Sequence, residues 1–158
     1  MSQTAFVPAT VPDPATITAY LRSQIPITGA VGLEVTAFDG TTLGARVPFG
    51  NNRNHNSSMF GGSLAMLGIL SGWSRLWALL RSRGVEANLV IRESATRFLS
   101  PTRSEAISRT EDLDPGEVER FFRAFARFGR ARLEVRTRIH SEGALVATHR
   151  GDFVALRS

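Results

Sequence analysis

The chain has 158 residues, of which 42% are apolar, and a formal net charge of +5. This length and composition predict one domain with one sizeable core. The chain contains no cysteine, which excludes disulfides, thiolate zinc sites and a cysteine nucleophile and is compatible with a reducing cytosol. Residues 1–14 also lack the basic start and apolar middle of a signal peptide, so we expect a cytoplasmic protein.

All 19 basic residues are arginine. Biased codon usage is the simple explanation. The functional alternative is a surface that attracts anions, such as the phosphates of CoA, an acidic carrier protein or nucleic acid. The sequence has no helix-turn-helix pattern, zinc-finger spacing or aromatic RNA-binding signature, so nucleic acid is not an expected partner.

Residues 1–12 are mostly small and carry no periodic pattern, which predicts a disordered tail ahead of one domain over residues 13–158. Asp13-Pro14 is typical of an N-cap followed by proline in the first turn of a helix. A short helix is therefore predicted over about 14–24, and Pro26 ends it.

Alternating apolar residues next predict two strands, over about 31–37 and 43–49. Asp39-Gly40 lies between them and is a strong hairpin signal. These two strands should therefore be antiparallel neighbours in a sheet.

A polar loop then leads into the most apolar run of the chain, which predicts a helix over about 59–82 ended by Gly84. The first charged residue after Arg53 is Arg75. A helix that is apolar on all sides must be buried on all sides. We judge this one too short and too rich in glycine to span a bilayer, so no membrane partner is expected.

The remaining pattern predicts four strands with one short helix among them. Asp114-Pro115 opens that helix in the same way as Asp13-Pro14. There is no alternating strand–helix–strand series, which argues against a parallel doubly wound sheet. We predict an α+β fold in which an antiparallel sheet wraps around the buried helix. The later elements are expected at about 87–98, 104–111, 115–127 (helix), 130–139 and 144–156.

Several motifs spread over about residues 25–156 are shared with a known family. They are Ile25-Pro26, Asp39-Gly40, the run from Asn54 to Leu64, Gly72-Trp73, the run from Val90 to Ser94, Phe98 and Pro101. With these motifs the chain resembles hotdog-fold thioesterases, most closely the family typified by the YiiD C-terminal domain. The resemblance implies a curved antiparallel sheet around a long central helix.

The resemblance also implies the hydrolysis of an acyl-CoA or acyl-carrier-protein thioester, without a cofactor. It further implies a homodimer or a dimer of dimers with active sites between subunits. Many hotdog thioesterases carry an Asp or Glu in the central helix, but this chain has neither from Met59 to Ser74. In some relatives a histidine precedes the two glycines, where this chain has Phe60. The missing helix carboxylate favours an alternative function, a non-catalytic acyl-CoA-binding protein that acts as a sensor or scaffold.

The first turn of the central helix is the predicted centre of the chemistry. Thioester hydrolysis needs stabilisation of the carbonyl oxygen, and the backbone N–H groups of Gly61 and Gly62 could supply it. The alternative is that these glycines only let the helix pack closely against a strand. Both interpretations can hold together.

The polar loop supplies further candidates. Asn54 could hydrogen-bond the carbonyl or orient water, or it could bond only to its own loop. His55 could be the general base, since its unperturbed pKa lies near neutrality, or it could be a solvated loop residue. Asn56, Ser58 and Phe60 are expected to contact the substrate.

Glu93 is the second candidate base. The alternation of its strand places it on the face that carries Leu89, Ile91 and Ala95, where a carboxylate would be partly desolvated and its pKa raised. The alternatives are an ion pair with a nearby arginine, or a bulge that turns Glu93 outward.

Arg97 and Arg103 are expected to bind CoA phosphates. The phenylalanines of 121–128 are interpreted as core, or as the lining of an acyl pocket. The arginines of 130–138 are interpreted as one solvated strand face, or as a second phosphate contact. No metal site is predicted, because His55, His140 and His149 show no ligand spacing.

Overall fold

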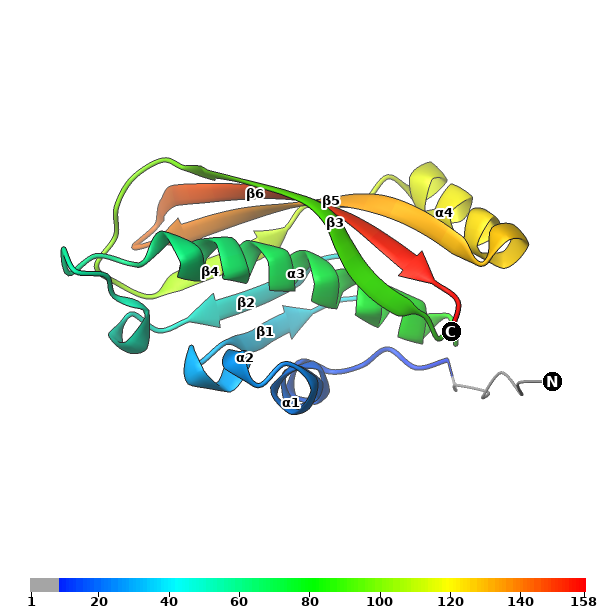
Figure 1. Cartoon of the computed structure of the whole chain (residues 1–158), viewed down its shortest axis with the longest axis horizontal. Coiled ribbons are helices and arrows are strands. Elements are labelled where there is room, and N and C mark those ends of the chain that lie inside the picture. The colour runs from blue at the N-terminus through cyan, green and yellow to red at the C-terminus, as the bar shows by residue number, and fades with distance from the viewer. Residues whose placement is uncertain (1–8) are drawn as a thin grey trace.

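Six antiparallel strands form one curved sheet in the order β1-β2-β4-β5-β6-β3 (Figure 1). The computed structural model describes residues 9–158, so the predicted disorder of residues 1–8 lies outside the described residues. The central strands β5 and β6 are the longest, and β1 and β3 are the two edges. The strands are β1 (Glu34–Phe38), β2 (Leu43–Val47), β3 (Asn88–Phe98), β4 (Ala106–Thr110), β5 (Arg130–Ser141) and β6 (Ala144–Leu156).

The helices begin where the sequence places capping residues. The Asp13 carboxylate accepts a hydrogen bond from the Thr16 N–H at 2.7 Å, and the Asp114 carboxylate accepts one from the Glu117 N–H at 2.9 Å. Both predicted caps are therefore confirmed. The helices are α1 (Pro14–Gln24), the short α2 (Ile27–Ala30), α3 (Gly61–Ser82) and α4 (Pro115–Phe128), with one 3₁₀ turn, η1 (Gly50–Asn52).

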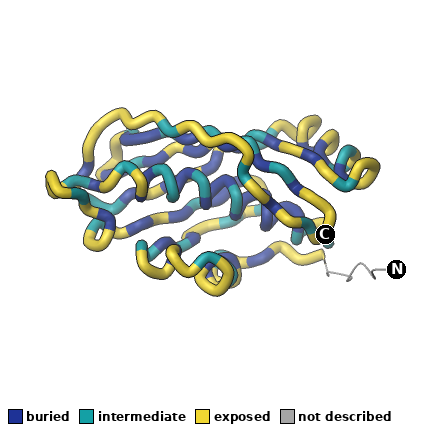
Figure 2. The backbone as a smooth tube through the Cα atoms, viewed as in Figure 1, coloured by how far each residue is buried: buried dark blue, intermediate teal, exposed yellow. Residues whose placement is uncertain are grey.

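Helix α3 lies along the concave side of the sheet (Figure 1). Most of its residues are buried, as are many residues of the strands (Figure 2). In length and hydropathy α3 would suffice to cross a membrane, so the prediction that it is too short was wrong. However, 78% of its apolar window is buried inside the protein, which is how a core helix is expected to lie. The predicted α+β hotdog arrangement is confirmed.

Two glycines let α3 approach the sheet closely. A Cβ atom on Gly68 would lie 2.4 Å from the Cβ of His149, and one on Gly72 would lie 2.7 Å from the ring of Phe153. No side chain fits at either position without moving its neighbour. The glycines of the helix interior thus allow close packing against the sheet. Gly61 and Gly62 of the first turn lie instead next to exposed aromatic rings.

Helix α1 and the segment before it cover the C-terminal half of α3. Tyr20 stacks on Trp77 with a centroid distance of 4.4 Å and on Trp73 at 6.1 Å. Ahead of α1, the Thr10 N–H donates to the Arg81 carbonyl at 3.2 Å. These contacts close the sheet's hollow at this end of α3.

Strand β3 changes face in its middle. It pairs with β6 in the register Ile91 to Phe153 and then Glu93 to Asp152, which inserts one extra residue, Arg92, as a β-bulge. Because side chains alternate between faces, a bulge reverses which residues face the helix. The predicted face that joined Leu89 and Ile91 to Glu93 is therefore wrong beyond Ile91.

Candidate active site

The first turn of α3 has no side-chain cap. The N-cap residue is Phe60, and its carbonyl accepts hydrogen bonds from the N–H groups of Ser63 and Leu64 at 2.9 and 3.2 Å. Within residues 9–158, the N–H groups of Gly61 and Gly62 have no hydrogen-bond acceptor. The helix therefore begins with two free donors at the positive end of its dipole, at half-buried and exposed residues respectively.

Aromatic side chains flank these donors. The ring of Phe60 covers Gly62 so closely that a Cβ atom there would lie 2.3 Å from it. The ring of Phe98, at the end of β3, lies against Gly61, where a Cβ atom would be 3.4 Å away. Phe60 and Phe98 are 55% and 56% exposed. Two solvent-exposed phenylalanine rings thus flank the first turn of α3, and they offer an apolar surface for a ligand to contact.

The loop before α3 is held by backbone hydrogen bonds. The Phe60 N–H donates to the Asn52 carbonyl at 2.6 Å, and the Met59 N–H donates to the Thr102 carbonyl at 2.7 Å. Asn52 is buried, and its amide group donates to the carbonyls of Val31 and Pro48. The start of α3 is therefore fixed to two other segments of the chain.

Asn54 is used inside this loop. Its Oδ1 accepts hydrogen bonds from the N–H groups of Asn56 and Ser58 at 2.9 and 3.1 Å, and its Nδ2 donates to the Ser58 Oγ at 3.0 Å. The local interpretation of Asn54 is the one that these bonds support. His55 and the side chain of Asn56 are exposed in the same loop. Neither Asn56 nor Ser58 caps α3, because Phe60 occupies the N-cap position.

Glu93 does not face α3. The bulge turns it to the opposite side of the sheet, where its side chain is 59% exposed and its carboxylate lies 3.4 Å from Arg150. The predicted desolvation of Glu93 is therefore wrong for this chain, and the bulge alternative is correct.

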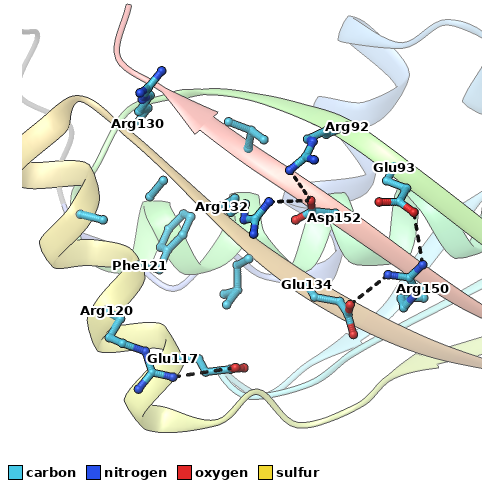
Figure 3. A pocket seen from close by; sticks show the side chains of 14 residues that line it. Arg92, Glu93, Glu117, Arg120, Phe121, Arg130, Arg132, Glu134, Arg150 and Asp152 are labelled. Carbon is cyan, nitrogen blue, oxygen red and sulfur yellow. Dashed lines mark hydrogen bonds and ion pairs between the residues drawn. The ribbon is translucent and has the colours of Figure 1, made fainter.

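Glu93 instead lines an open groove of about 1040 Å³ between α4 and strands β3, β5 and β6. Figure 3 shows two networks among its charged side chains, one from Glu93 through Arg150 to Glu134 and one that joins Asp152 to Arg92 and Arg132, besides a separate ion pair of Glu117 with Arg120. Neither network includes a residue from the first turn of α3. We therefore do not assign this groove to the thioester chemistry.

The bulge brings Ser94 to the helix side of β3. The Ser94 Oγ lies 2.8 Å from Nε2 of His149, a residue of β6 that is only 3% exposed and packs against Gly68 of α3. Burial, with a smaller contribution from the charge of Arg150, lowers the pKa of His149 from 6.5 to about 4. No pattern in the sequence predicted this pair. The only signal was a histidine on the apolar face of a predicted strand, which gives no partner.

Three arginines lack acidic partners among residues 9–158. They are Arg53 and Arg103, in the two loops that the Met59–Thr102 hydrogen bond joins, and Arg97, which precedes Phe98 on β3 and by alternation points to the outer face of the sheet. All three are exposed. Over the same residues, no group of three or more His, Asp or Glu side chains is placed to hold a metal ion.

Comparison with known proteins identifies the family. A family model described as "Putative thioesterase (yiiD_Cterm)" matches residues 14–157. The chain belongs to the YiiD C-terminal thioesterase family. Membership supports thioesterase activity in general and covers all the secondary structure described above.

Solved structures share the fold of this YiiD C-terminal family member. A Chlorobaculum tepidum protein of unknown function has 22% identity and a TM-score of 0.86 over 94% of this chain and 99% of that one. A thioesterase described as putative from Shewanella oneidensis has 21% identity and a TM-score of 0.78, covering 90% and 96%. A Haemophilus influenzae thioesterase has 15% identity and a TM-score of 0.74, covering 96% and 95%. At these identities the likeness concerns the fold.

Proposed function

We propose that this protein hydrolyses the thioester of an acyl-CoA or acyl-carrier protein, with the carbonyl oxygen bound by the N–H groups of Gly61 and Gly62. The observation that carries the proposal is the pair of free donors at the start of α3. Negative charge develops on a thioester oxygen when water attacks, and preorganised N–H groups at a helix N-terminus stabilise that charge.

The surroundings of the donors support an acyl thioester as the ligand. The rings of Phe60 and Phe98 offer apolar contact to an acyl chain or to the pantetheine arm. Arg53, Arg97 and Arg103 have no acidic partner in the described chain and could bind the phosphates of either carrier.

We further propose that two copies associate through β3. This strand is an edge of the sheet, so one side of its backbone is without a strand partner. Val90, Phe98 and Leu99 are 47%, 56% and 48% exposed along this edge. An unpaired edge with exposed apolar side chains invites pairing with another strand, and an antiparallel pair of β3 strands would give a symmetric dimer. Sedimentation equilibrium of the whole chain measures this association.

The donor at Gly61 can be removed without disturbing the helix. Gly61 is the first helical residue, where proline is well tolerated, and Phe60 already has the extended backbone that precedes a proline (φ −62°, ψ 129°). Helices α1 and α4 both begin with proline in this chain. We expect Gly61→Pro to lower kcat for thiol release by about 100-fold or more, the cost of one missing oxyanion donor.

Gly61→Ala is the matched control. It keeps the N–H group, and its Cβ atom would meet only the Phe98 ring at an ordinary contact distance of 3.4 Å. Its loss of kcat should therefore be far smaller than that of Gly61→Pro. Equal losses in two variants that are equally folded by circular dichroism would contradict the oxyanion role of this N–H.

The second candidate function is acyl-CoA binding without hydrolysis. The lack of any Asp or Glu from Met59 to Ser74 favours it, as does the outward position of Glu93. Titration calorimetry and thiol release over a panel of acyl-CoAs separate the two functions. Heat of binding without release for every acyl group would establish the binding protein and overturn the hydrolase.

A further inference from the structure

The hydrolysis proposed above needs a group that takes a proton from water, and the expected candidates are poorly placed. His55 is exposed in the loop and Glu93 faces the outer side of the sheet. Helix α3 has no carboxylate along its whole length. Ser94 and His149 are the remaining pair of polar side chains on the helix side of β3 and β6 that are joined by a hydrogen bond.

The pair has one accessible member and one hidden member. Ser94 is exposed, whereas His149 is 3% exposed and lies behind it. At neutral pH the imidazole is uncharged, so one of its ring nitrogens is an acceptor. If the Ser94 hydroxyl donates to Nε2 over the observed 2.8 Å, its oxygen lone pairs remain free for a water molecule on the exposed side.

His149 is not placed as an ordinary core residue. Its Nδ1 is buried and has no hydrogen-bond partner in the described part of the chain. An unpaired buried polar atom costs free energy that an apolar side chain at the same position would avoid. The close approach of Gly68 leaves the ring little freedom to turn and satisfy this nitrogen elsewhere. The fold therefore directs the His149 Nε2 toward Ser94 even though this leaves Nδ1 without a hydrogen bond, which costs stability.

We propose that Ser94 and His149 form the proton relay that activates the hydrolytic water, an inference that rests on the proposed thioesterase function. Water attacks the carbonyl carbon while its proton passes to the Ser94 Oγ and the Ser94 proton passes to the His149 Nε2. The tetrahedral intermediate then breaks its C–S bond, and the leaving sulfur takes the proton back through Ser94. The products are a carboxylic acid and a free thiol.

The relay and the oxyanion donors of one chain do not meet at a single carbonyl. Ser94 lies four residues before Phe98, the residue that contacts Gly61, and four strand residues span about 13 Å. Two β3 strands paired antiparallel about Thr96 would place Ser94 opposite Phe98 of the partner subunit. The relay of one subunit would then face Gly61 of the partner subunit, so that each dimer has two shared sites.

Ser94→Ala tests the relay. Ser94 is exposed, so the variant should fold, and kcat for thiol release should fall by about 100-fold with little change in KM, because a proton transfer is lost and not a binding contact. Ser94→Thr keeps the hydroxyl and should retain most of the rate. Ser100→Ala removes an exposed hydroxyl just beyond the same strand and should match the wild-type chain.

The pH profile provides a second readout. The relay requires neutral His149, so kcat should stay level from neutral pH downward and fall only near the pKa of His149, about 4. A fall centred well above pH 4 would show that another group accepts the proton and would overturn the relay. Gly68 is the α3 residue against His149, and it does not titrate. On the adjoining strands His149 is paired with Thr96 and Thr137, which do not titrate, and the charge that acts on it is that of Arg150, the next residue of β6.

Mixed dimers test the shared site. Random mixing of Ser94→Ala and Gly61→Pro subunits makes half of the dimers mixed, and each of these keeps one intact site, so about a quarter of the wild-type rate should return. No recovery would overturn the shared site. Wild-type rates in Ser94→Ala would overturn the relay and leave the hydrolase standing. No thiol release by the wild-type chain from any acyl-CoA would overturn the hydrolase, and the relay with it.

Discussion

The two ends of helix α3 are built for opposite purposes. From Ser74 to Leu80 every residue is buried, and the aromatic stack of Tyr20 with Trp73 and Trp77 covers this half. At the other end, Gly61 is half-buried and Gly62 is exposed, with uncapped N–H groups between exposed aromatic rings. One helix thus combines a packed end with an open end.

The packed end of α3 compensates for the stability that its uncapped N-terminus does not provide. An uncapped N-terminus leaves donors unpaired and contributes little to stability. In this chain the opposite half of α3 fixes the helix through packing, and the bonds from Phe60 to Asn52 and from Met59 to Thr102 fix the loop before it. Three experiments, from the largest expected effect to the smallest, can break or sharpen this division.

Acid should lower the free energy of unfolding through His149, which packs against the middle of α3. Its folded pKa of about 4 lies below the unfolded value of 6.5, so the unfolded chain binds more protons in between. Stability is fully present above about pH 6.5 and is lost as the pH falls toward 4. The shift corresponds to about 2 kcal/mol after allowance for solvent screening, measured by urea unfolding at pH 7 and pH 4.5.

His149→Gln is the control for this measurement. Carboxylates whose pKa is lowered by hydrogen bonds, such as Asp13, Glu119 and Glu134, lose their stabilising effect progressively below about pH 5. The part of the loss between pH 6.5 and 4.5 that is missing in His149→Gln therefore belongs to the histidine. An equally steep loss in His149→Gln would show that another group is responsible.

Alanine at two glycines of α3 compares its packed part with its open end. A Cβ atom on Gly72 would lie 2.7 Å from the ring of Phe153, which is fully buried and cannot move away easily. Overpacking costs about 1–3 kcal/mol and the gain in helix propensity is about 1 kcal/mol, so Gly72→Ala should lose up to about 2 kcal/mol.

Gly61→Ala should change the free energy of unfolding by less than about 0.5 kcal/mol, because its Cβ atom would meet only the Phe98 ring at 3.4 Å. Urea unfolding of both variants gives the difference. If the two substitutions cost the same, the two parts of α3 are not packed differently and the division fails.

Arg75 is an exception within the packed half. It is 3% exposed, its Nε and Nη1 have no partner in the described chain, and its guanidinium lies 5.8 Å from the Phe38 ring. Burial lowers its pKa, although an arginine stays charged at neutral pH. Because a buried charge without a partner is costly, Arg75→Met should stabilise the protein by about 1 kcal/mol.

The control is Arg81→Met, in the same half of α3. Arg81 is half-buried and lies 5.2 Å from the Trp77 ring, so its loss should be neutral or cost about 0.5 kcal/mol. Thermal unfolding at one pH compares both variants. A clear destabilisation by Arg75→Met would show that the guanidinium has a stabilising partner that the static structure lacks.

Local signals in the sequence predicted most of the fold. The capped helices at Asp13 and Asp114 are where they were expected. The turn at Gly40 and the end of α3 at Gly84 use positive φ angles of 89° and 65°, which glycine adopts readily. These features depend on residues within a few positions of one another, so they can be predicted from the sequence.

The site depended more on contacts between distant residues. Glu93 and Ser94 are neighbours in sequence, but a bulge in the pairing with β6 sends Glu93 outward and brings Ser94 to His149. Nothing in the sequence around Arg92 marks that bulge. The sequence left open whether the Asn54 side chain hydrogen-bonds its own loop or a substrate. The structure supports the first alternative, because the side chain hydrogen-bonds to Ser58.

By itself, the sequence determined that an apolar helix with two leading glycines would be enclosed by an antiparallel sheet, because periodicity, capping and turn chemistry all act over short stretches of chain. The tertiary structure alone decided which polar groups end up free and which ones meet. Strand register and helix position are set by packing between residues more than fifty positions apart, and a one-residue shift there exchanges one candidate base for another.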